Sequence, residues 1–218
     1  MHEFMIGQRE EGGYSLAFAS SRERLEKLSP QQIAQNTTCE FNPGNNCFRL
    51  ESFGIPFEVS YQDGDVRFQG QEGIKPIIPW RLLLLNSLSE AKDLPVEGKW
   101  ISYKDQPNGN VFHPAINSDV IEPMGRFYDN CDKQALRTSL AQLGFELVEG
   151  RAALTARGFF APKVPVLLQF WDGDDEIPGN FQILFDAGIV NQMHIEDSAG
   201  LCELIKYLIV KHYDLAVL

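Results

Sequence analysis

Apolar residues recur with helical spacing near both ends of the chain. Residues 14–27 place Leu16 and Leu25 roughly on one side with charged residues between them, which is typical of an amphipathic helix. Ser29 followed by Pro30 predicts a second, short helix, because serine is a good N-cap and proline fits the first helical turn.

The leucine-rich run of residues 78–93 has the wide apolar face of a helix packed in a core. Gly144 is expected to end a later helix as its C-cap, and Glu196 or Asp197 is expected to open the last helix, where the helix dipole favours negative charge. These later helical stretches are residues 114–130, 132–144 and 200–215.

Elsewhere the apolar period changes to two, which indicates strands. In residues 47–68, Phe48 and Leu50 alternate with polar neighbours, and Asp63-Gly64 is a strong hairpin turn because glycine supplies a positive φ. We therefore predict an antiparallel meander in this stretch. Further hairpins are expected in residues 99–113, with Pro107-Asn108-Gly109 as the turn, and in residues 164–186.

Helices bracket pairs of strands, and the two kinds of element do not alternate singly. This order favours an α+β fold, with an antiparallel sheet built from hairpins and meanders and packed with several helices, over a doubly wound parallel fold. No internal repeat or low-complexity linker divides the chain. We expect one domain over residues 1–218, with the N-terminal helical segment of about residues 14–36 packed on it.

The formal net charge of −11 argues against nucleic acid as a partner, because neutralising phosphates needs clustered Lys and Arg. It also disfavours binding to anionic membranes, and the longest apolar run is too short to span a bilayer. The four cysteines form no C-x-x-C pair. Because the start of the chain lacks a signal-peptide pattern, we expect a cytoplasmic protein with reduced thiols.

Several common catalytic motifs are absent from the sequence. There is no G-x-G-x-x-G after a strand, no G-x-x-x-x-G-K-[ST], no H-E-x-x-H and no G-x-S-x-G. These absences remove the usual phosphate-binding loops, the zincin proteases and the α/β-hydrolases from consideration.

The acidic stretch between the last two predicted strands is a candidate metal site through Asp172, Asp174 and Glu176. Hard divalent cations prefer several close carboxylates, but the EF-hand pattern fails because isoleucine stands at its sixth and twelfth positions. The alternative is a solvated hairpin tip whose charges resist edge-to-edge pairing. Asp186 joins these acids only if the strand register brings it near; otherwise it caps the following turn.

Aromatic and histidine side chains supply candidate ligands for a cofactor. Trp100, Tyr103 and Trp171 are able to line a pocket for a flat molecule, although aromatic residues on strands are more often part of the core. His113, expected in a loop after a strand, and His194, just before the last helix, are candidate ligands or bases.

The order of these pieces resembles that of the DUF3786 family, an uncharacterised bacterial and archaeal domain. The tryptophan–acid–Pro–Leu-Phe-Asp hairpin is the most specific of the shared motifs, and the earlier "FRLESFGIPFEV" also fits the family. The other matching stretches are "LLLLNSL", "VEGKWISYKDQPNGNVFHPAI", "VPVLLQFWDGDDEIPGNFQILFD" and "HIEDSAGLCELIKYLI".

Members of that family are found largely in anaerobes, near genes of corrinoid-dependent methyl transfer. The resemblance therefore implies an accessory or cofactor-handling role in anaerobic metabolism. Family members are sometimes fused to an iron–sulfur module, but this chain has no cysteine motif for one. Asn86 stands where relatives are expected to carry a histidine. If that histidine is a ligand, this chain uses His113 or His194 instead.

Three functions follow from these observations. The first is a non-catalytic binding protein for a cofactor, for example a corrinoid, or for another small molecule or a protein partner. The second is a metal-dependent hydrolase or lyase that uses the acids of residues 172–176 with a divalent ion. The third is an interaction protein without a small-molecule site. We favour the first.

Overall fold

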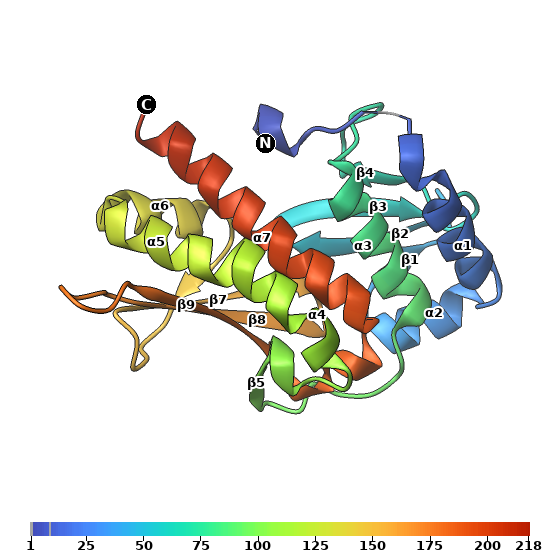
Figure 1. Cartoon of the computed structure of the whole chain (residues 1–218). Helices are drawn as coiled ribbons and strands as arrows, with labels where there is room; N and C mark the ends of the chain where they lie inside the picture. Colours follow the sequence, from blue (N-terminus) through green and yellow to red (C-terminus); the bar gives the residue numbers. More distant parts are fainter. Residues whose placement is uncertain (1, 9) are drawn as a thin grey trace.

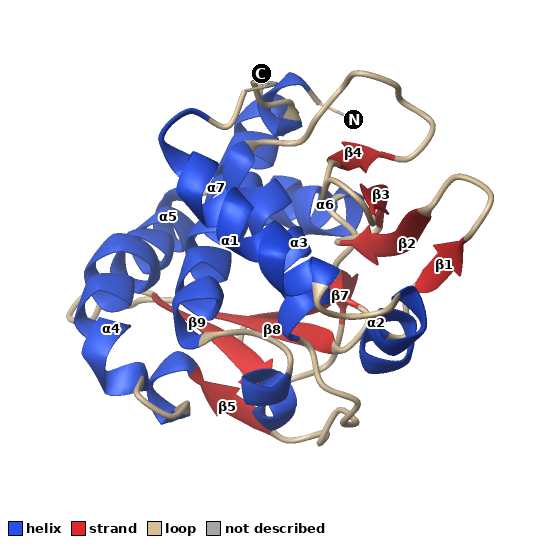
Figure 2. Cartoon of the chain, turned by 90° about the vertical axis from the view of Figure 1, so that its right-hand side faces the viewer, coloured by secondary structure: helices blue, strands red, loops and turns tan. Residues whose placement is uncertain are grey.

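The computed structural model describes residues 2–8 and 10–218, which form two antiparallel sheets with helices packed between and beside them (Figure 1). Helices gather on one side of the molecule, and the strands lie along two of its edges (Figure 2). The α+β fold class predicted from the order of elements is confirmed. None of the described helices is both long enough and apolar enough to cross a membrane.

The N-terminal sheet is a meander with strand order β1-β2-β3-β4. Leu50 pairs with Phe57 and Val59 with Val66, and all four side chains are buried, so the predicted antiparallel meander is confirmed. Phe53 and Gly54 form the first tight turn, both with positive φ. The strands are β1 Glu40–Asn42, β2 Cys47–Ser52, β3 Ile55–Ser60 and β4 Val66–Phe68.

The second sheet has five strands in the order β5-β9-β8-β7-β6. The expected hairpin of residues 164–186 is its centre: β8 and β9 pair from Val166 with Phe185 to Trp171 with Asn180. The strands are β5 Trp100–Ser102, β6 Glu146–Leu147, β7 Leu154–Ala161, β8 Val164–Trp171 and β9 Asn180–Asp186.

The predicted helices are present. Ser29 caps α2 and forms a capping box with Gln32, as its place before Pro30 predicts. The α-helices are α1 Ser15–Glu26, α2 Pro30–Thr37, α3 Ile78–Glu90, α4 Gly109–Ile116, α5 Glu122–Asn130, α6 Lys133–Gln142 and α7 Ile195–Ala216. Short helical turns are η1 Glu3–Met5, η2 Gly12–Tyr14, η3 Tyr103–Asp105, the π-helical η4 Asn117–Ile121, and η5 Ala187–Asn191.

Helix α3 lies at the centre and packs against both α1 and α7 (Figure 1). Four of its leucines, Leu83, Leu84, Leu85 and Leu88, are buried, and the indole nitrogen of Trp80 donates to the Ser52 hydroxyl at 2.9 Å. One continuous hydrophobic core includes side chains from both sheets and from α3, α6 and α7. The all-round apolar character of α3 therefore reflects a helix enclosed on most sides.

The two sheets meet where the β2–β3 turn contacts the segment after α6. The Phe53 amide donates to the carbonyl of Phe159 on β7 at 2.7 Å, and the ring of Phe53 stacks on Phe145. Gly144 has a φ of +76°, and a Cβ there would overlap the Phe53 carbonyl. Gly144 does end the helix before it, as expected, and it also permits this close approach.

The hairpin predicted in residues 99–113 is wrong. β5 pairs with β9 instead, and Asn108, with a φ of +64°, turns the chain into α4. Phe112 and Ile116, about one helical turn apart in α4, both pack against the core. His113 therefore lies on a helix and not in the expected loop.

The predicted apolar face of α1 is wrong in part. Leu16 is 84% exposed, whereas Phe18, Ser21 and Leu25 are buried. The buried positions are three and four residues apart and form the stripe that packs on α3. A serine within that stripe signals a polar contact inside the helix–helix interface.

Candidate functional site

The two tryptophans predicted to share a cofactor pocket lie far apart. Trp171 is opposite Asn180 at the start of β9, whereas Trp100 is opposite Asp186 at its end. Six residue steps of extended strand separate these positions by about 20 Å. The strand register therefore keeps the two indoles out of a common pocket.

Tyr103 and His194, two other predicted cofactor-binding residues, lie together at the start of α7. The Tyr103 hydroxyl donates to the carbonyl of Ile195 at 3.1 Å, and burial raises the pKa of Tyr103 to about 12. His194 is the N-cap of α7, and its Nδ1 accepts from the Glu196 amide at 3.3 Å. The side chain of His194 is exposed, whereas that of Tyr103 is buried. His194 is therefore the more accessible of the two to a ligand from solvent.

His194 borders a hollow of about 290 Å³ at this end of α7, but His113 is not among the described residues that line it. Gln106 is buried there, and its side-chain nitrogen has no hydrogen-bond partner among the described residues. Its carbonyl oxygen accepts from the Ser198 hydroxyl at 3.1 Å. The structure thus places Tyr103 and His194 on either side of Ile195, whereas Trp100, His113 and Trp171 are not among the described residues that line the hollow.

The acidic loop is an exposed hairpin tip, with Asp172, Asp174 and Glu176 all accessible to solvent. Asp174 accepts from the amides of Glu176 at 2.9 Å and Ile177 at 2.8 Å, and these hydrogen bonds lower its pKa. Outside residues 1 and 9, no group of three or more His, Cys, Asp or Glu side chains is placed to hold a metal ion. The metal-dependent alternative therefore stays an untested prediction.

A carboxylate outside the loop fixes the shape of this tip. Asp129, at the end of α5, accepts from the Gly173 amide at 3.1 Å and from the Gly179 amide at 2.6 Å. A Cβ on Gly179 would overlap the Asp129 carboxylate. The two glycines of the acidic motif thus permit a hydrogen-bonded latch that the sequence does not reveal.

Asp186 is buried at the opposite end of β9 from the tip and does not join the acids there. Its carboxylate accepts from the amides of Glu97 at 2.8 Å, Gly98 at 2.6 Å and Gly188 at 2.8 Å. It therefore caps the turn that follows, as the alternative prediction states, and also holds the segment before β5. Because three backbone amides donate to it, the Asp186 carboxylate has a structural role.

A polar cluster, which we define as Ser21, Arg24, Asn86, Glu90 and Asp197, lies where α1, α3 and α7 meet. The Asn86 side-chain oxygen accepts from the Ser21 hydroxyl and, at 3.0 Å, from Arg24. The Asn86 nitrogen donates to Asp197 Oδ1 at 2.8 Å. Arg24 also pairs with Glu90 at 3.1 Å. Asn86 thus links a helix near the N-terminus to the first turn of the last helix.

The Asp197 carboxyl is the perturbed acid of this polar cluster. Burial raises its pKa to about 6, and the nearby charge of Glu90 acts in the same direction. The hydrogen bond from Asn86 and the charges of His194 and Arg24 oppose that rise. Because desolvation dominates, a carboxylate at this position is costly for the folded state.

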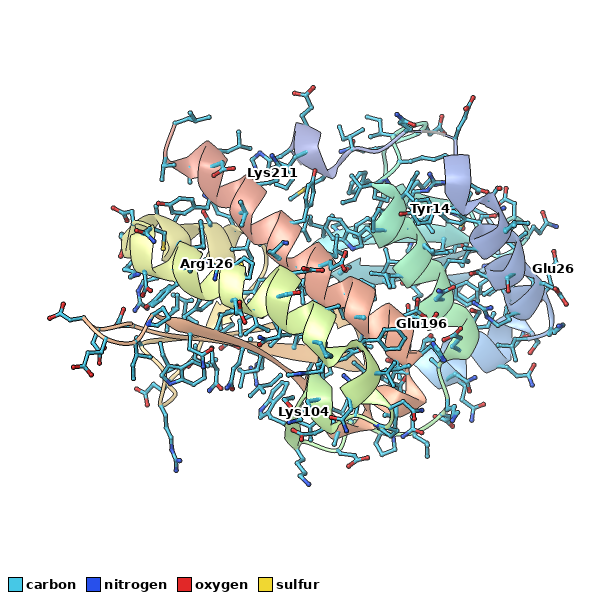
Figure 3. All side chains as sticks on the ribbon, viewed as in Figure 1. Tyr14, Glu26, Lys104, Arg126, Glu196 and Lys211 are labelled. Carbon is cyan, nitrogen blue, oxygen red and sulfur yellow. The ribbon has the colours of Figure 1, made fainter. Side chains whose placement is uncertain are left out.

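Asp197 also borders a groove of about 540 Å³ between α3 and α7, which we call the α3–α7 groove. Tyr14 and Glu196, which both line it, are seen on the helical face of the molecule in Figure 3. Most of the lining is apolar or aromatic. The lining residues are Tyr14, Ile77, Pro79, Leu82, Leu83, Glu196, Asp197, Gly200, Glu203, Leu204 and Tyr207.

The sequence offered one signal for this site. Asn86 is a polar residue within a run of leucines, and a buried amide needs hydrogen-bond partners. Its partner Asp197 lies 111 residues further along the chain, so no local pattern joins the two. Asp197 was expected only as an acid that opens the last helix, which it also is.

Searches among curated proteins and among solved structures give no match to this chain. A family model described as a domain of unknown function matches residues 29–207, which span β1 to β9 and most of α7. That stretch holds Asn86, Glu90 and Asp197 of the polar cluster and every lining residue of the α3–α7 groove except Tyr14. The chain therefore belongs to the DUF3786 family.

Proposed function

We propose that this protein is a non-catalytic binding protein that holds a small organic ligand or cofactor in the α3–α7 groove. The observation that carries the proposal is the groove itself: about 540 Å³ of mostly apolar lining with a few polar groups. Sites for small molecules have volumes of roughly 300–1,000 Å³ and this kind of lining. Burial of an apolar ligand surface supplies the affinity, and the polar groups orient the ligand.

The chemistry of the lining supports binding more than catalysis. The described lining residues offer carboxylates and tyrosines but no serine, cysteine, histidine or lysine. A nucleophile with an adjacent base is the usual arrangement for covalent catalysis, and this groove does not contain one among those residues. Among the described lining residues, Asp197 is the single charged group that is partly buried, and its hydrogen-bond partner is an amide and not a base.

Helix α7 contributes a glycine, Gly200, to the lining of the groove. A Cβ at Gly200 would meet only the Leu83 side chain at 3.6 Å, an ordinary contact distance. A larger side chain at this position therefore extends into the groove, while the helix itself gains propensity. Gly200→Phe is thus a blocking variant, and Ala141→Phe on the exposed face of α6 is its matched control.

The general test uses the neutral apolar dye Nile red, whose fluorescence rises in an apolar site. We expect saturable binding to the wild type and to Ala141→Phe, and a loss of at least tenfold in affinity for Gly200→Phe. Equal affinity for the blocking variant would place the dye elsewhere and would refute the α3–α7 groove as the binding site.

A corrinoid is the specific cofactor that the family resemblance suggests. The test is incubation with hydroxocobalamin, removal of free corrinoid by desalting, and absorbance of the protein. A red protein with equimolar cobalt that is lost in Gly200→Phe supports a corrinoid in this groove. A colourless wild type removes the corrinoid and leaves a different organic ligand as the occupant.

A further inference from the structure

We infer that the ligand of the α3–α7 groove is an organic cation, an alkylammonium group attached to an apolar body. This inference rests on the proposed function and names the chemical class of its ligand. It is carried by the charges, hydrogen bonds and aromatic rings of the described residues that line the groove.

The charge of the lining is of one sign. Glu196, Asp197 and Glu203 contribute three carboxyl groups, whereas no Lys, Arg or His is among the described lining residues. A groove with low-dielectric walls and charges of one sign concentrates counter-ions of the other sign. The carboxylates would repel an anionic ligand, and a neutral ligand would gain no electrostatic attraction from them.

The acids follow one stripe of α7. Glu196, Gly200, Glu203 and Tyr207 are spaced by four, three and four residues, so they lie along the same face of the helix. From the first to the last of them the stripe is about 16 Å long. It therefore offers a charged end near Glu196, a bare backbone at Gly200 and an aromatic end at Tyr207.

The Asp197 carboxylate has one oxygen without a hydrogen bond from the described residues. Asn86 holds Oδ1 at 2.8 Å, and no described residue donates to Oδ2. The charge of Glu90 disfavours the ionised form of Asp197, whereas the charges of His194 and Arg24 favour it. A cation arriving from the groove would offset the cost of burying this charge, because ion pairs are stronger where water is excluded.

Two tyrosines supply the other feature that cation sites use. Tyr14 and Tyr207 both line the groove, and the Tyr207 hydroxyl donates to the Phe4 carbonyl at 3.0 Å, which fixes its ring. The faces of aromatic rings attract alkylammonium groups, and such rings recur in sites for quaternary ammonium ligands. Leu82, Leu83 and Leu204 provide apolar surface for the remainder of the ligand.

The volume favours a small molecule over a peptide. A cavity of about 540 Å³ is within the range that encloses a drug-sized ligand. A basic amphipathic helix would match the charge but would leave most of its own surface outside such a groove. We therefore assign the site to a small organic cation and treat a basic peptide as a competing outcome.

The experiment compares three probes with the same six-carbon tail at pH 7.5: hexyltrimethylammonium, hexanol and hexanoate. Binding is measured by NMR shifts of the Gly200 and Glu203 amides and by displacement of Nile red. We expect the ammonium probe to bind at least tenfold more tightly than the other two. Asp197→Asn should reduce that preference at least fivefold, and Glu203→Gln, at an exposed position, less than twofold.

The outcomes separate this inference from the proposed function. If hexanol or hexanoate binds as tightly as the ammonium probe, and Gly200→Phe abolishes that binding, the cation is refuted and the groove retained. If a lysine-rich amphipathic peptide displaces the dye at lower concentration than the ammonium probe, the small-molecule class is refuted. If neither the dye nor any probe binds, the proposed function itself is refuted.

Discussion

Two aspartates, eleven residues apart, have opposite surroundings in this fold. Asp186 ends β9 and accepts from three backbone amides, whereas Asp197 opens α7 and accepts from one side-chain amide at the edge of an apolar groove. The first carboxylate is solvated by the backbone, and the second is not. Burial alone therefore does not make a carboxylate costly to the folded state; the lack of fixed hydrogen-bond donors does.

The largest effect is expected when Asp186 is replaced. Asp186→Ala leaves the amides of Glu97, Gly98 and Gly188 without their acceptor, at roughly 1–3 kcal/mol for each buried donor. We expect the free energy of unfolding, measured by urea denaturation, to fall by about 3–5 kcal/mol. Asp186→Asn keeps one acceptor oxygen and should lose less. A loss below about 1 kcal/mol for the alanine variant would contradict the structural role.

Replacement of Asp197 is expected to stabilise the folded protein, in contrast to replacement of Asp186. The Asp197 pKa of about 6 in the folded protein lies above its ordinary value of 3.8, so the folded state holds the proton more tightly than the unfolded state does. The stability from this group is therefore full below about pH 4 and is lost as the pH rises through 6. Asp197→Asn should raise the free energy of unfolding at pH 7.5 by up to about 3 kcal/mol.

The check on Asp197 is the pH profile. Urea denaturation between pH 4 and 8 should show a decline for the wild type that is absent in Asp197→Asn. Glu203→Gln, an exposed acid in the same groove, is the control and should keep the wild-type slope. An unchanged slope in Asp197→Asn would mean that another group carries the pH dependence.

An intermediate effect is expected at Asn86. Asn86→Ala removes the partner of Ser21, Arg24 and Asp197 in one step, so unfolding should become easier by about 2 kcal/mol. Because the Asn86 hydrogen bond opposes the rise in the Asp197 pKa, that pKa should move further upward. Carbon-13 NMR of the Asp197 carboxyl measures the change directly. A lower pKa in the variant would show that the amide does not stabilise the carboxylate.

The smallest effect is expected at the hairpin tip. Asp129→Ala removes the acceptor of two exposed amides, Gly173 and Gly179, so the loss of stability should be about 1 kcal/mol. Hydrogen exchange at these amides should become faster, because the latch to α5 is gone. Asp175→Ala, an exposed acid of the same loop, should stay within about 0.5 kcal/mol of the wild type.

Much of the fold follows from local patterns in the sequence. The β8–β9 hairpin, the meander of residues 47–68 and the leucine-rich α3 are each specified by side-chain period and turn residues within a short stretch. The prediction failed at Pro107-Asn108-Gly109, because a left-handed asparagine followed by glycine serves equally to open a helix. Only the packing of Phe112 and Ile116 on the core decides between the two.

The candidate site was harder to predict, because it depends on packing between distant segments. Asn86 and Asp197 meet only when α3 and α7 pack side by side (Figure 1). Trp100 and Trp171 are both aromatic residues on strands, which predicts one pocket, but the pairing of β5 with the far end of β9 separates them. The residue types predict which side chains are candidates for a site, but strand register and helix packing determine which of them lie close together.

The contact between Gly144 and the Phe53 carbonyl has a consequence for how this family is able to diversify. Because the backbone of Gly144 lies directly against the Phe53 carbonyl and the Phe53 ring stacks on Phe145, an insertion in either turn displaces both halves together. A recombination that exchanges the N-terminal meander between relatives must therefore exchange the segment around Gly144 together with the turn around Phe53. The stability of chimeras that take Phe53 from one parent and Gly144 from another measures how strictly the two halves depend on each other.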